Sequence, residues 1–260
     1  MSNDGSVPRG ERRECRIIVA CMPKSGSTFL TQLIAEIPGM RHGFPVAGYE
    51  RREQEICLER LKQEILKTKL LRQMRDHGTL PDMPRPLGFV AQMHLRHSAP
   101  TASIIRNHGI VPVVLVRNLF DVVVSMKDHL CNRPVEIPMA YVTTAMRAWP
   151  EDRLYAFIAD MIIPWYLNFY LNWFNAGDVK FLTYEDLLAN PKAVLRGVAE
   201  HVGLPLSDES LDAAVEAAQA RVPRNVGVAG RGERLPAAVK ERIRHLASYY
   251  EDCDFSRLGL

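Results

Sequence analysis

A short apolar run that leads into a glycine-containing loop constrains this chain more than any other feature. Arg16–Cys21 is apolar and β-branched, which predicts a buried strand. The loop Met22–Ser27 follows it, and a helix is expected from about Thr28 to Ile37. A strand, a tight loop and a helix N-terminus bring free backbone N–H groups and the positive end of the helix dipole together. The order of these elements therefore predicts an anion site on an α/β fold.

The residue types within this loop suit a phosphate. Gly26 lets the backbone approach a ligand closely, Ser27 and Thr28 add hydroxyl donors, and Lys24 adds a full positive charge. The loop does not match the Walker A pattern GxxxxGK[ST], because its lysine precedes the glycine. Phosphate binding and an ordinary turn both stay open on residue types alone, and we favour phosphate binding.

Further apolar runs alternate with helical stretches along the chain. Strands are expected at Gly88–Met93, Val111–Val116 and Val179–Thr183, and helices near residues 54–75, 101–108, 191–202 and 210–219. The first of these helices is amphipathic and is expected to pack on the domain. The alternation predicts a single α/β domain, in which a parallel sheet is flanked by helices. Residues 1–15 are expected to form a flexible N-terminus and residues 16–260 the domain.

Composition excludes several classes of protein. The formal net charge of +3 is too small to indicate nucleic-acid binding, and the five cysteines lack the CxxC spacing of structural zinc. The apolar stretch Leu154–Phe174 contains Asp160 and Pro164, so we interpret it as a buried helix and expect no membrane span. Its aromatic residues are expected to pack in the core more than to line a ligand site. The polar N-terminus lacks the apolar segment of a signal peptide, and a cytoplasmic location is expected.

A second cluster of polar residues follows the strand predicted at residues 111–116. Arg117 stands at the strand end, with Asp121 and Ser125 after it. P-loop phosphoryl-transfer enzymes usually have an acidic residue at a comparable place, where it holds Mg²⁺. An arginine would repel a metal ion and attract another anion. The pattern indicates either a second phosphate subsite or a surface ion pair between Arg117 and Asp121.

Four segments together resemble one known family. Cys21–Phe29 resembles the 5′-phosphosulfate loop of sulfotransferases that use 3′-phosphoadenosine 5′-phosphosulfate (PAPS), and Arg117–Ser125 resembles their 3′-phosphate motif. Tyr184–Leu187, with the following Asn190-Pro191, and the glycine-rich Asn225–Gly232 resemble two further stretches of the family. The resemblance implies the nucleotide-kinase-like sulfotransferase fold. Residues 47–87 and 131–177 are not assigned by it.

The resemblance also implies roles for single residues in binding the nucleotide. The implied nucleotide-binding residues are Lys24, Ser25, Gly26, Ser27, Thr28, Phe29, Arg117, Ser125, Tyr184, Arg224, Gly227 and Gly230. Lys24 would also contact the oxygen that bridges phosphate and sulfate and stabilise the leaving group. Phe29 would lie against the adenine and Tyr184 would reach the nucleotide. The 3′-phosphate would be bound by Arg117 and Ser125, with the glycine-rich segment covering it.

The family's general base is a histidine in a K-[TS]-H setting, just after the second strand. This chain has Gln92-Met93-His94 there, so the histidine is present and the lysine is not. An ordinary histidine pKa of about 6.5 allows proton removal at neutral pH. His94 is the expected base, and His97 is the competitor. A structural role for both histidines is also open.

These expectations together predict in-line transfer of a sulfuryl group from PAPS to a hydroxyl or amine of a small-molecule acceptor. No metal is required. The alternatives are an ATP-dependent small-molecule kinase, and a non-catalytic protein that binds PAPS or its product 3′-phosphoadenosine 5′-phosphate (PAP). The acceptor and the oligomeric state stay open.

Overall fold

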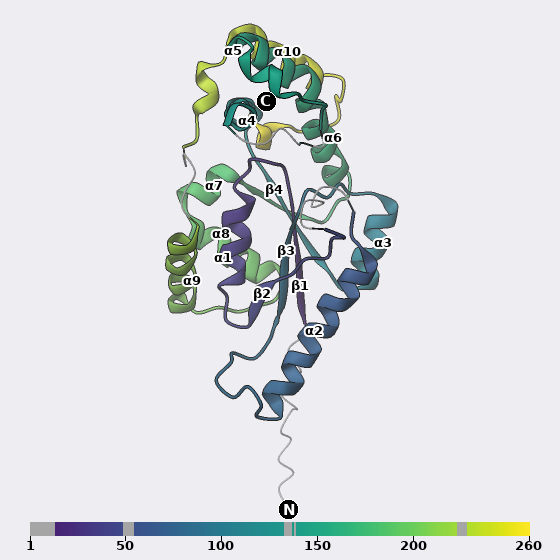
Figure 1. The fold of residues 1–260 in the computed structure, drawn as a ribbon, viewed down its shortest axis with the longest axis vertical. Coiled ribbons are helices and arrows are strands. Elements are labelled where there is room, and N and C mark those ends of the chain that lie inside the picture. Colours follow the sequence, from purple (N-terminus) through teal and green to yellow (C-terminus); the bar gives the residue numbers. More distant parts are fainter. Residues whose placement is uncertain (1–13, 49–54, 133–136, 138, 223–227) are drawn as a thin grey trace, which may run out of the picture.

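The computed structural model describes residues 14–48, 55–132, 137, 139–222 and 228–260 of the chain. Its centre is a parallel sheet of five strands in the order β2-β3-β1-β4-β5 (Figure 1). The strands are β1 (Cys15–Cys21), β2 (Met40–His42), β3 (Gly88–Met93), β4 (Val111–Val116) and β5 (Lys180–Thr183). The predicted parallel α/β domain is confirmed. The sequence did not indicate β2, because three residues are too few to show a strand period.

Helices connect the strands and extend the chain beyond β5. They are α1 (Ser27–Ala35), α2 (Leu58–Asp76), α3 (Ala99–Asn107), α4 (Leu119–Asn132), α5 (Glu151–Phe157), α6 (Ile163–Phe174), α7 (Tyr184–Ala189), α8 (Pro191–His201), α9 (Asp208–Arg221) and α10 (Ala237–Ala247). Of the predicted flexible N-terminus, residues 1–13 lie outside the described part of the chain, and Cys15 already belongs to β1.

Both faces of the sheet are covered, which explains why the strands are apolar throughout. Ile17 and Val19 of β1 pack in a core cluster with residues of α1, α8 and α9. Ile18 and Ala20, on the opposite face, pack in a second cluster with residues of α2, α3, α4 and α6. Alternate residues of a strand point to opposite faces, so a strand buried on both faces reads as one apolar run.

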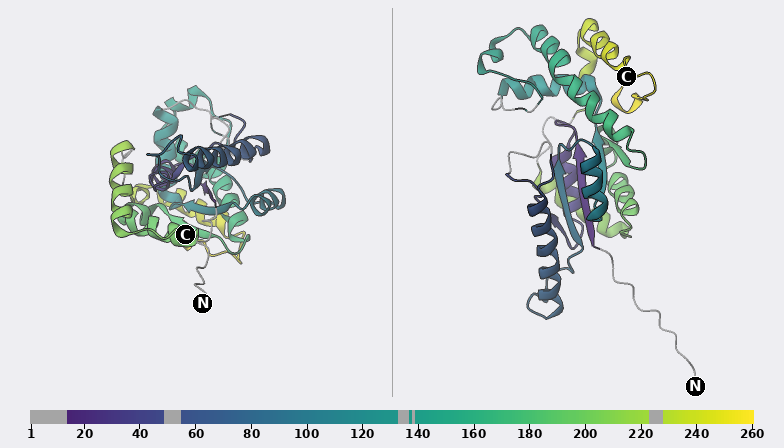
Figure 2. Two further views of the ribbon diagram at one scale, coloured as in Figure 1. Left: turned by 90° about the horizontal axis from the view of Figure 1, so that it is seen from below. Right: turned by 90° about the vertical axis from the view of Figure 1, so that its right-hand side faces the viewer.

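All strands end at the same edge of the sheet. The chain segments that follow β1, β3, β4 and β5 therefore lie next to one another at this carboxyl edge. Helices α5, α6 and α10 lie beyond it, at the top of Figure 1 and in the right view of Figure 2. Open α/β sheets place their ligands at this edge.

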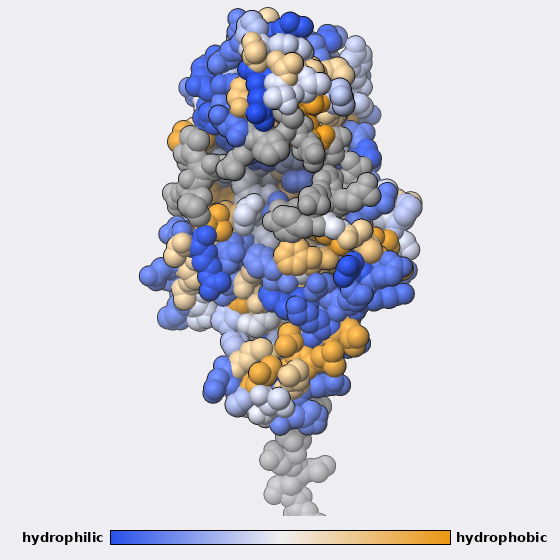
Figure 3. All heavy atoms as spheres, viewed as in Figure 1, coloured by the Kyte–Doolittle hydropathy of each residue, from blue (hydrophilic) through white to orange (hydrophobic). Residues whose placement is uncertain are grey.

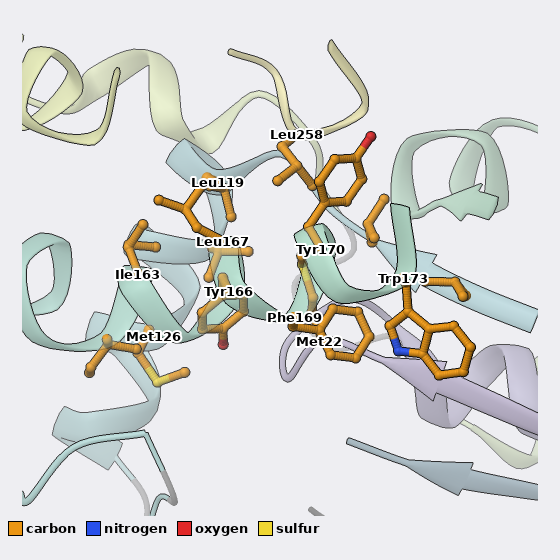
Figure 4. Close-up of a cluster of buried hydrophobic side chains, with 14 of the residues drawn as sticks. Met22, Leu119, Met126, Ile163, Tyr166, Leu167, Phe169, Tyr170, Trp173 and Leu258 are labelled. Carbon is orange, nitrogen blue, oxygen red and sulfur yellow. The ribbon is translucent and has the colours of Figure 1, made fainter. Parts of the chain in front are cut away.

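The predicted buried helix at residues 154–174 consists of α5, a π-helical turn (Ile158–Ile162) and α6. Four aromatic residues of α6, Tyr166, Phe169, Tyr170 and Trp173, are fully buried in the core (Figure 4). Within the described residues, Glu151–Phe174 is the one helical run that is long and apolar enough to cross a membrane, and 56% of its apolar window is buried in the protein. Most of its large apolar residues pack in the domain core, whereas Met161 is exposed.

Helix α2 packs on the domain, as expected, but only through part of its apolar stripe. Leu61 is fully buried, but Leu66, Leu70 and Met74 are 55%, 49% and 40% exposed. Figure 3 shows apolar residues on the surface where α2 lies. The reason is geometric, because the C-terminal part of α2 projects past the sheet (Figure 2).

Gly88 gives a test of the packing between β1 and β3. A Cβ atom at Gly88 would lie 1.6 Å from the carbonyl oxygen of Cys15 on the paired strand, so Gly88→Ala must separate the strands. We expect a loss of about 2–3 kcal/mol in the free energy of unfolding, measured by urea denaturation. Gly48→Ala is the control, because nothing lies within 4 Å of a Cβ there. Equal unfolding midpoints for the two variants would contradict this packing.

Candidate functional site

The loop between β1 and α1 has a conformation that few residues adopt. Lys24 and Gly26 both have positive φ, at 67° and 81°, and Lys24 is the one non-glycine residue in this region within the described chain. A Cβ atom on Gly26 would lie 2.7 Å from the ring of Tyr184, so only glycine fits. The N–H groups of Phe29 and Leu30 donate to the Gly26 carbonyl and begin α1. The loop is thus a tight, fixed turn rather than an open connection.

Two hydroxyl groups of the loop are buried. Ser25 is fully buried, and its Oγ donates to the Met22 carbonyl at 2.6 Å, which closes the loop on itself. Ser27, at the start of α1, is 5% exposed. The hydroxyl of Ser25 therefore stabilises the loop, and the backbone N–H is the Ser25 group left to face a ligand.

Carbonyl groups of the loop are turned toward donors from distant parts of the chain. The Tyr166 hydroxyl on α6 donates to the Pro23 carbonyl at 3.1 Å, and Arg117 Nη1 donates to the Lys24 carbonyl at 2.9 Å. In a trans peptide the N–H points opposite to the C=O. The N–H groups of Lys24 and Ser25 therefore point away from Tyr166 and Arg117, respectively.

His94 is fixed by the pairing of β1 and β3. Ala20 pairs with Met93, so Cys21 and His94 lie side by side where the two strands end. His94 Nδ1 lies 2.9 Å from the Cys21 carbonyl oxygen. Because a carbonyl oxygen only accepts, Nδ1 carries the hydrogen and the lone pair of the neutral ring is on Nε2. This is the tautomer that a base acting through Nε2 needs.

The competing histidine has different surroundings. The His97 ring lies 5.2 Å from the ring of Trp173, between their centroids. Partial burial, and then the charge of Arg106, lower the pKa of His97. His94 contacts the end of β1 next to the loop, whereas His97 contacts a core aromatic of α6.

Arg117 lies at the end of β4 and is 4% exposed. Its guanidinium stacks on the Tyr184 ring at 4.0 Å, and Nη2 donates to the Val228 carbonyl at 3.3 Å. Nη2 also lies 3.4 Å from Asp121 Oδ2, so the predicted ion pair forms, but it is buried and not on the surface. Arg117 Nε is buried with no hydrogen-bond partner in the described part of the chain. Arg117 thus pairs with Asp121 and also contacts the loop between β1 and α1.

Asp121 connects the C-terminal segment to α4, a role that the sequence did not indicate. Its Oδ2 accepts from the Gly230 N–H at 2.9 Å, and its Oδ1 accepts from the Gly232 N–H at 2.7 Å. A Cβ atom on Gly232 would lie 2.4 Å from Phe120 Cβ, so the backbone approaches α4 as closely as only glycine allows. The sequence signal that could have indicated this contact is an aspartate one turn after Arg117, together with the glycines of the C-terminal segment.

The remaining predicted site residues differ in how close they lie to the loop after β1 and to Arg117. Tyr184 begins α7 and lies between Gly26 and Arg117. Ser125 is half-buried on α4, and Phe29 is half-buried on α1, where it packs against the core. Thr28 is exposed. Arg224 and Gly227 lie outside the described residues.

Burial raises the pKa of the Tyr184 phenol, which therefore stays neutral near pH 7. Burial also raises the pKa of the neighbouring Glu185, whose carboxylate accepts the Asn118 N–H at 3.2 Å.

No cluster of three or more histidine, cysteine or acidic side chains suited to a metal ion occurs among the described residues.

Comparison with known proteins identifies the family. Residues 14–245 match the family model described as the sulfotransferase domain. The chain therefore belongs to the sulfotransferase family. Sulfotransferase 6B1 from Pan troglodytes is 26% identical over 208 residues, and Sulfotransferase 6B1 from Mus musculus is 26% identical over 210 residues. These matches cover 77% and 78% of this chain, and this chain spans 59% of the length of each relative.

Solved structures show the same fold. The mouse sulfotransferase SULT7A1, in a complex with PAP, has a TM-score of 0.63 at 15% identity, covering 94% of this chain and 87% of that one. A retinol dehydratase, in a complex with androsterone and inactive cofactor PAP, has a TM-score of 0.54 at 17% identity, covering 93% and 82%. The predicted sulfotransferase fold is confirmed.

Asp121 gives a test of how the site is held together. Asp121→Asn removes the charge that pairs with buried Arg117 and leaves one oxygen for two N–H groups. We expect the free energy of unfolding to fall by about 3 kcal/mol, and the Gly230 and Gly232 amides to exchange hydrogen faster. Hydrogen exchange and urea denaturation measure the two effects.

Asp128→Asn is the matched control, because Asp128 pairs with Arg231 of the same segment at the more exposed surface. Its removal should cost less than about 1 kcal/mol. A loss as large as that of Asp121→Asn would show that burial of the Asp121 carboxylate is not decisive.

Proposed function

We propose that this chain transfers a sulfuryl group from PAPS to a hydroxyl or amine of a small-molecule acceptor. One observation carries the proposal. The loop after β1, His94 after β3 and Arg117 after β4 meet at one edge of the sheet, joined through the Cys21 and Lys24 carbonyl groups. A glycine-containing turn at a helix N-terminus, a histidine and a buried arginine are thus in one place, which supports the proposal. The PAP complexes of structurally similar proteins support the same nucleotide.

In this proposal the phosphosulfate lies on the loop between β1 and α1. The backbone N–H groups of Lys24 and Ser25 and the N-terminus of α1 face its 5′-phosphate. Arg117 and Ser125 bind the 3′-phosphate, and Tyr184 and Phe29 flank the nucleotide. Arg224, Gly227 and Gly230 stay candidates for the segment that covers it, although the Gly230 N–H donates to Asp121 in this structure.

His94 is the base in the proposed reaction. Its Nε2 takes the acceptor proton while the acceptor oxygen or nitrogen attacks sulfur. The bond between sulfur and the bridging oxygen breaks, and PAP leaves with the electron pair. Lys24 and the loop N–H groups stabilise the negative charge that develops on the leaving phosphate. The Cys21 carbonyl holds the His94 ring in place for the proton transfer.

Turnover of sulfur-labelled PAPS against a library of alcohols, phenols and amines tests the function. Because Arg117 stands where a metal-binding acid would be needed, we expect labelled product to form in the presence of EDTA at an unchanged rate. ATP should not replace PAPS. A strict Mg²⁺ requirement with transfer from ATP would support the kinase alternative instead, and PAP binding without turnover would support the non-catalytic one.

His94→Ala is the control that separates chemistry from binding. It should lower kcat by about 10²–10⁴-fold and leave PAP affinity nearly unchanged, because the base acts only on the acceptor. His97→Ala should have a much smaller effect. If His97→Ala abolishes turnover instead, the base is misassigned, whereas the nucleotide site can still stand.

Ser125 gives a cleaner test of the 3′-phosphate site than Arg117, which also holds the Lys24 and Val228 carbonyl groups. Ser125→Ala should weaken PAP binding by about tenfold through the loss of one hydrogen bond to a charged group. Binding of adenosine 5′-phosphosulfate, which lacks the 3′-phosphate, should be unchanged. Calorimetry measures both ligands, and equal losses for the two would place Ser125 elsewhere.

A further inference from the structure

Gln92 is a polar residue in the otherwise apolar strand β3. It pairs with Val19 of β1 and is half-buried, and the other strand residues are buried. Val90, two residues earlier, packs with the core cluster that includes α1, so Gln92 lies on the same face. Burying an amide costs free energy unless it is hydrogen-bonded. The hydrogen-bond partners of the Gln92 side chain therefore indicate its role.

The Gln92 amide contacts two hydroxyl groups in the first turn of α1. Nε2 donates to Ser27 Oγ at 2.9 Å. The Thr28 hydroxyl donates to Oε1 at 3.5 Å. One neutral side chain of β3 thus bridges two neighbouring hydroxyl groups at the start of the helix that follows the loop.

The direction of these hydrogen bonds distinguishes the three hydroxyl groups of the loop and helix start. The Ser25 hydrogen is used on the Met22 carbonyl, and the Thr28 hydrogen is directed at Gln92. Ser27 Oγ accepts from Gln92, so its own hydrogen must point elsewhere. Within the described chain, no hydrogen bond donated by the Ser27 hydroxyl occurs.

We propose that Gln92 is a positioning residue, which orients the Ser27 hydroxyl so that it donates its hydrogen to the 5′-phosphate of the sulfuryl donor. The inference rests on the proposed function, because it takes PAPS as the ligand of the loop. An amide suits this task because its N–H₂ group donates to Ser27 while its oxygen accepts from Thr28. A carboxylate at this position would accept from both hydroxyl groups and turn the Ser27 hydrogen away from the ligand.

A double-mutant cycle between Gln92 and Ser27 tests the proposal, with PAP binding measured by calorimetry. Gln92→Met keeps the length of the side chain and removes both hydrogen-bonding groups. We expect Ser27→Ala to weaken PAP binding about tenfold, and Gln92→Met to weaken it about three- to tenfold. The double variant should bind no more weakly than Ser27→Ala, because in this proposal Gln92 acts on the phosphate through the Ser27 hydroxyl.

Two further readouts separate positioning from a structural role. Gln92→Met should raise the KM for PAPS and change kcat by less than about threefold, because it acts on binding of the phosphate. Thr28→Val should weaken PAP binding less than Ser27→Ala does. Gln63→Met, at an exposed glutamine of α2, is the matched control and should change neither value.

The outcomes are distinct. Wild-type affinity in Gln92→Met, or losses that multiply in the double variant, would overturn the role of Gln92 and leave the proposed function in place. A wild-type protein that binds PAP to no measurable extent would overturn the proposed function, and this inference with it. Melting temperatures of all variants show whether a loss of affinity comes from unfolding.

Discussion

The buried guanidinium of Arg117 is the interaction on which the arrangement of the site depends. It contacts the loop after β1 through the Lys24 carbonyl, the C-terminal segment through the Val228 carbonyl, and α4 through Asp121. These segments are far apart in the chain. A buried charge must be compensated by its neighbours, so each contact is costly to lose. The arginine thus fixes the loop after β1, the C-terminal segment and α4 relative to one another.

The loop after β1 is likewise held by contacts within the protein. Its carbonyl groups accept from Tyr166, Arg117 and Ser25, and its positive φ angles at Lys24 and Gly26 complete the turn. A turn made in this way does not need the ligand to hold its shape. In the proposed reaction, little reorganisation of the loop would then be needed to stabilise a developing charge. Asp121 extends this order to the segment around Gly230 and Gly232.

Much of the fold could be predicted from the sequence, because strands buried on both faces are continuous apolar runs. The strands at residues 88–93 and 111–116 were predicted with their observed bounds. The local pattern does not show where a helix extends beyond the domain that it packs on. Leu66, Leu70 and Met74 have the spacing of a packed helix face, but α2 runs past the sheet and leaves them exposed. Strand β2 was missed because its three residues carry no period.

The sequence by itself determined which residues stand at the strand ends and in the loop, since these positions follow from the alternation of strands and helices. Lys24 and Arg117 were placed after predicted strands on that ground, and the family resemblance added His94 after the strand at residues 88–93. Only the tertiary structure decided how they are held. The buried Arg117–Asp121 pair, the His94 tautomer set by the Cys21 carbonyl and the Gln92 bridge to Ser27 depend on strand register and side-chain direction. Contacts between residues distant in the chain arise from packing, and local sequence patterns do not encode them.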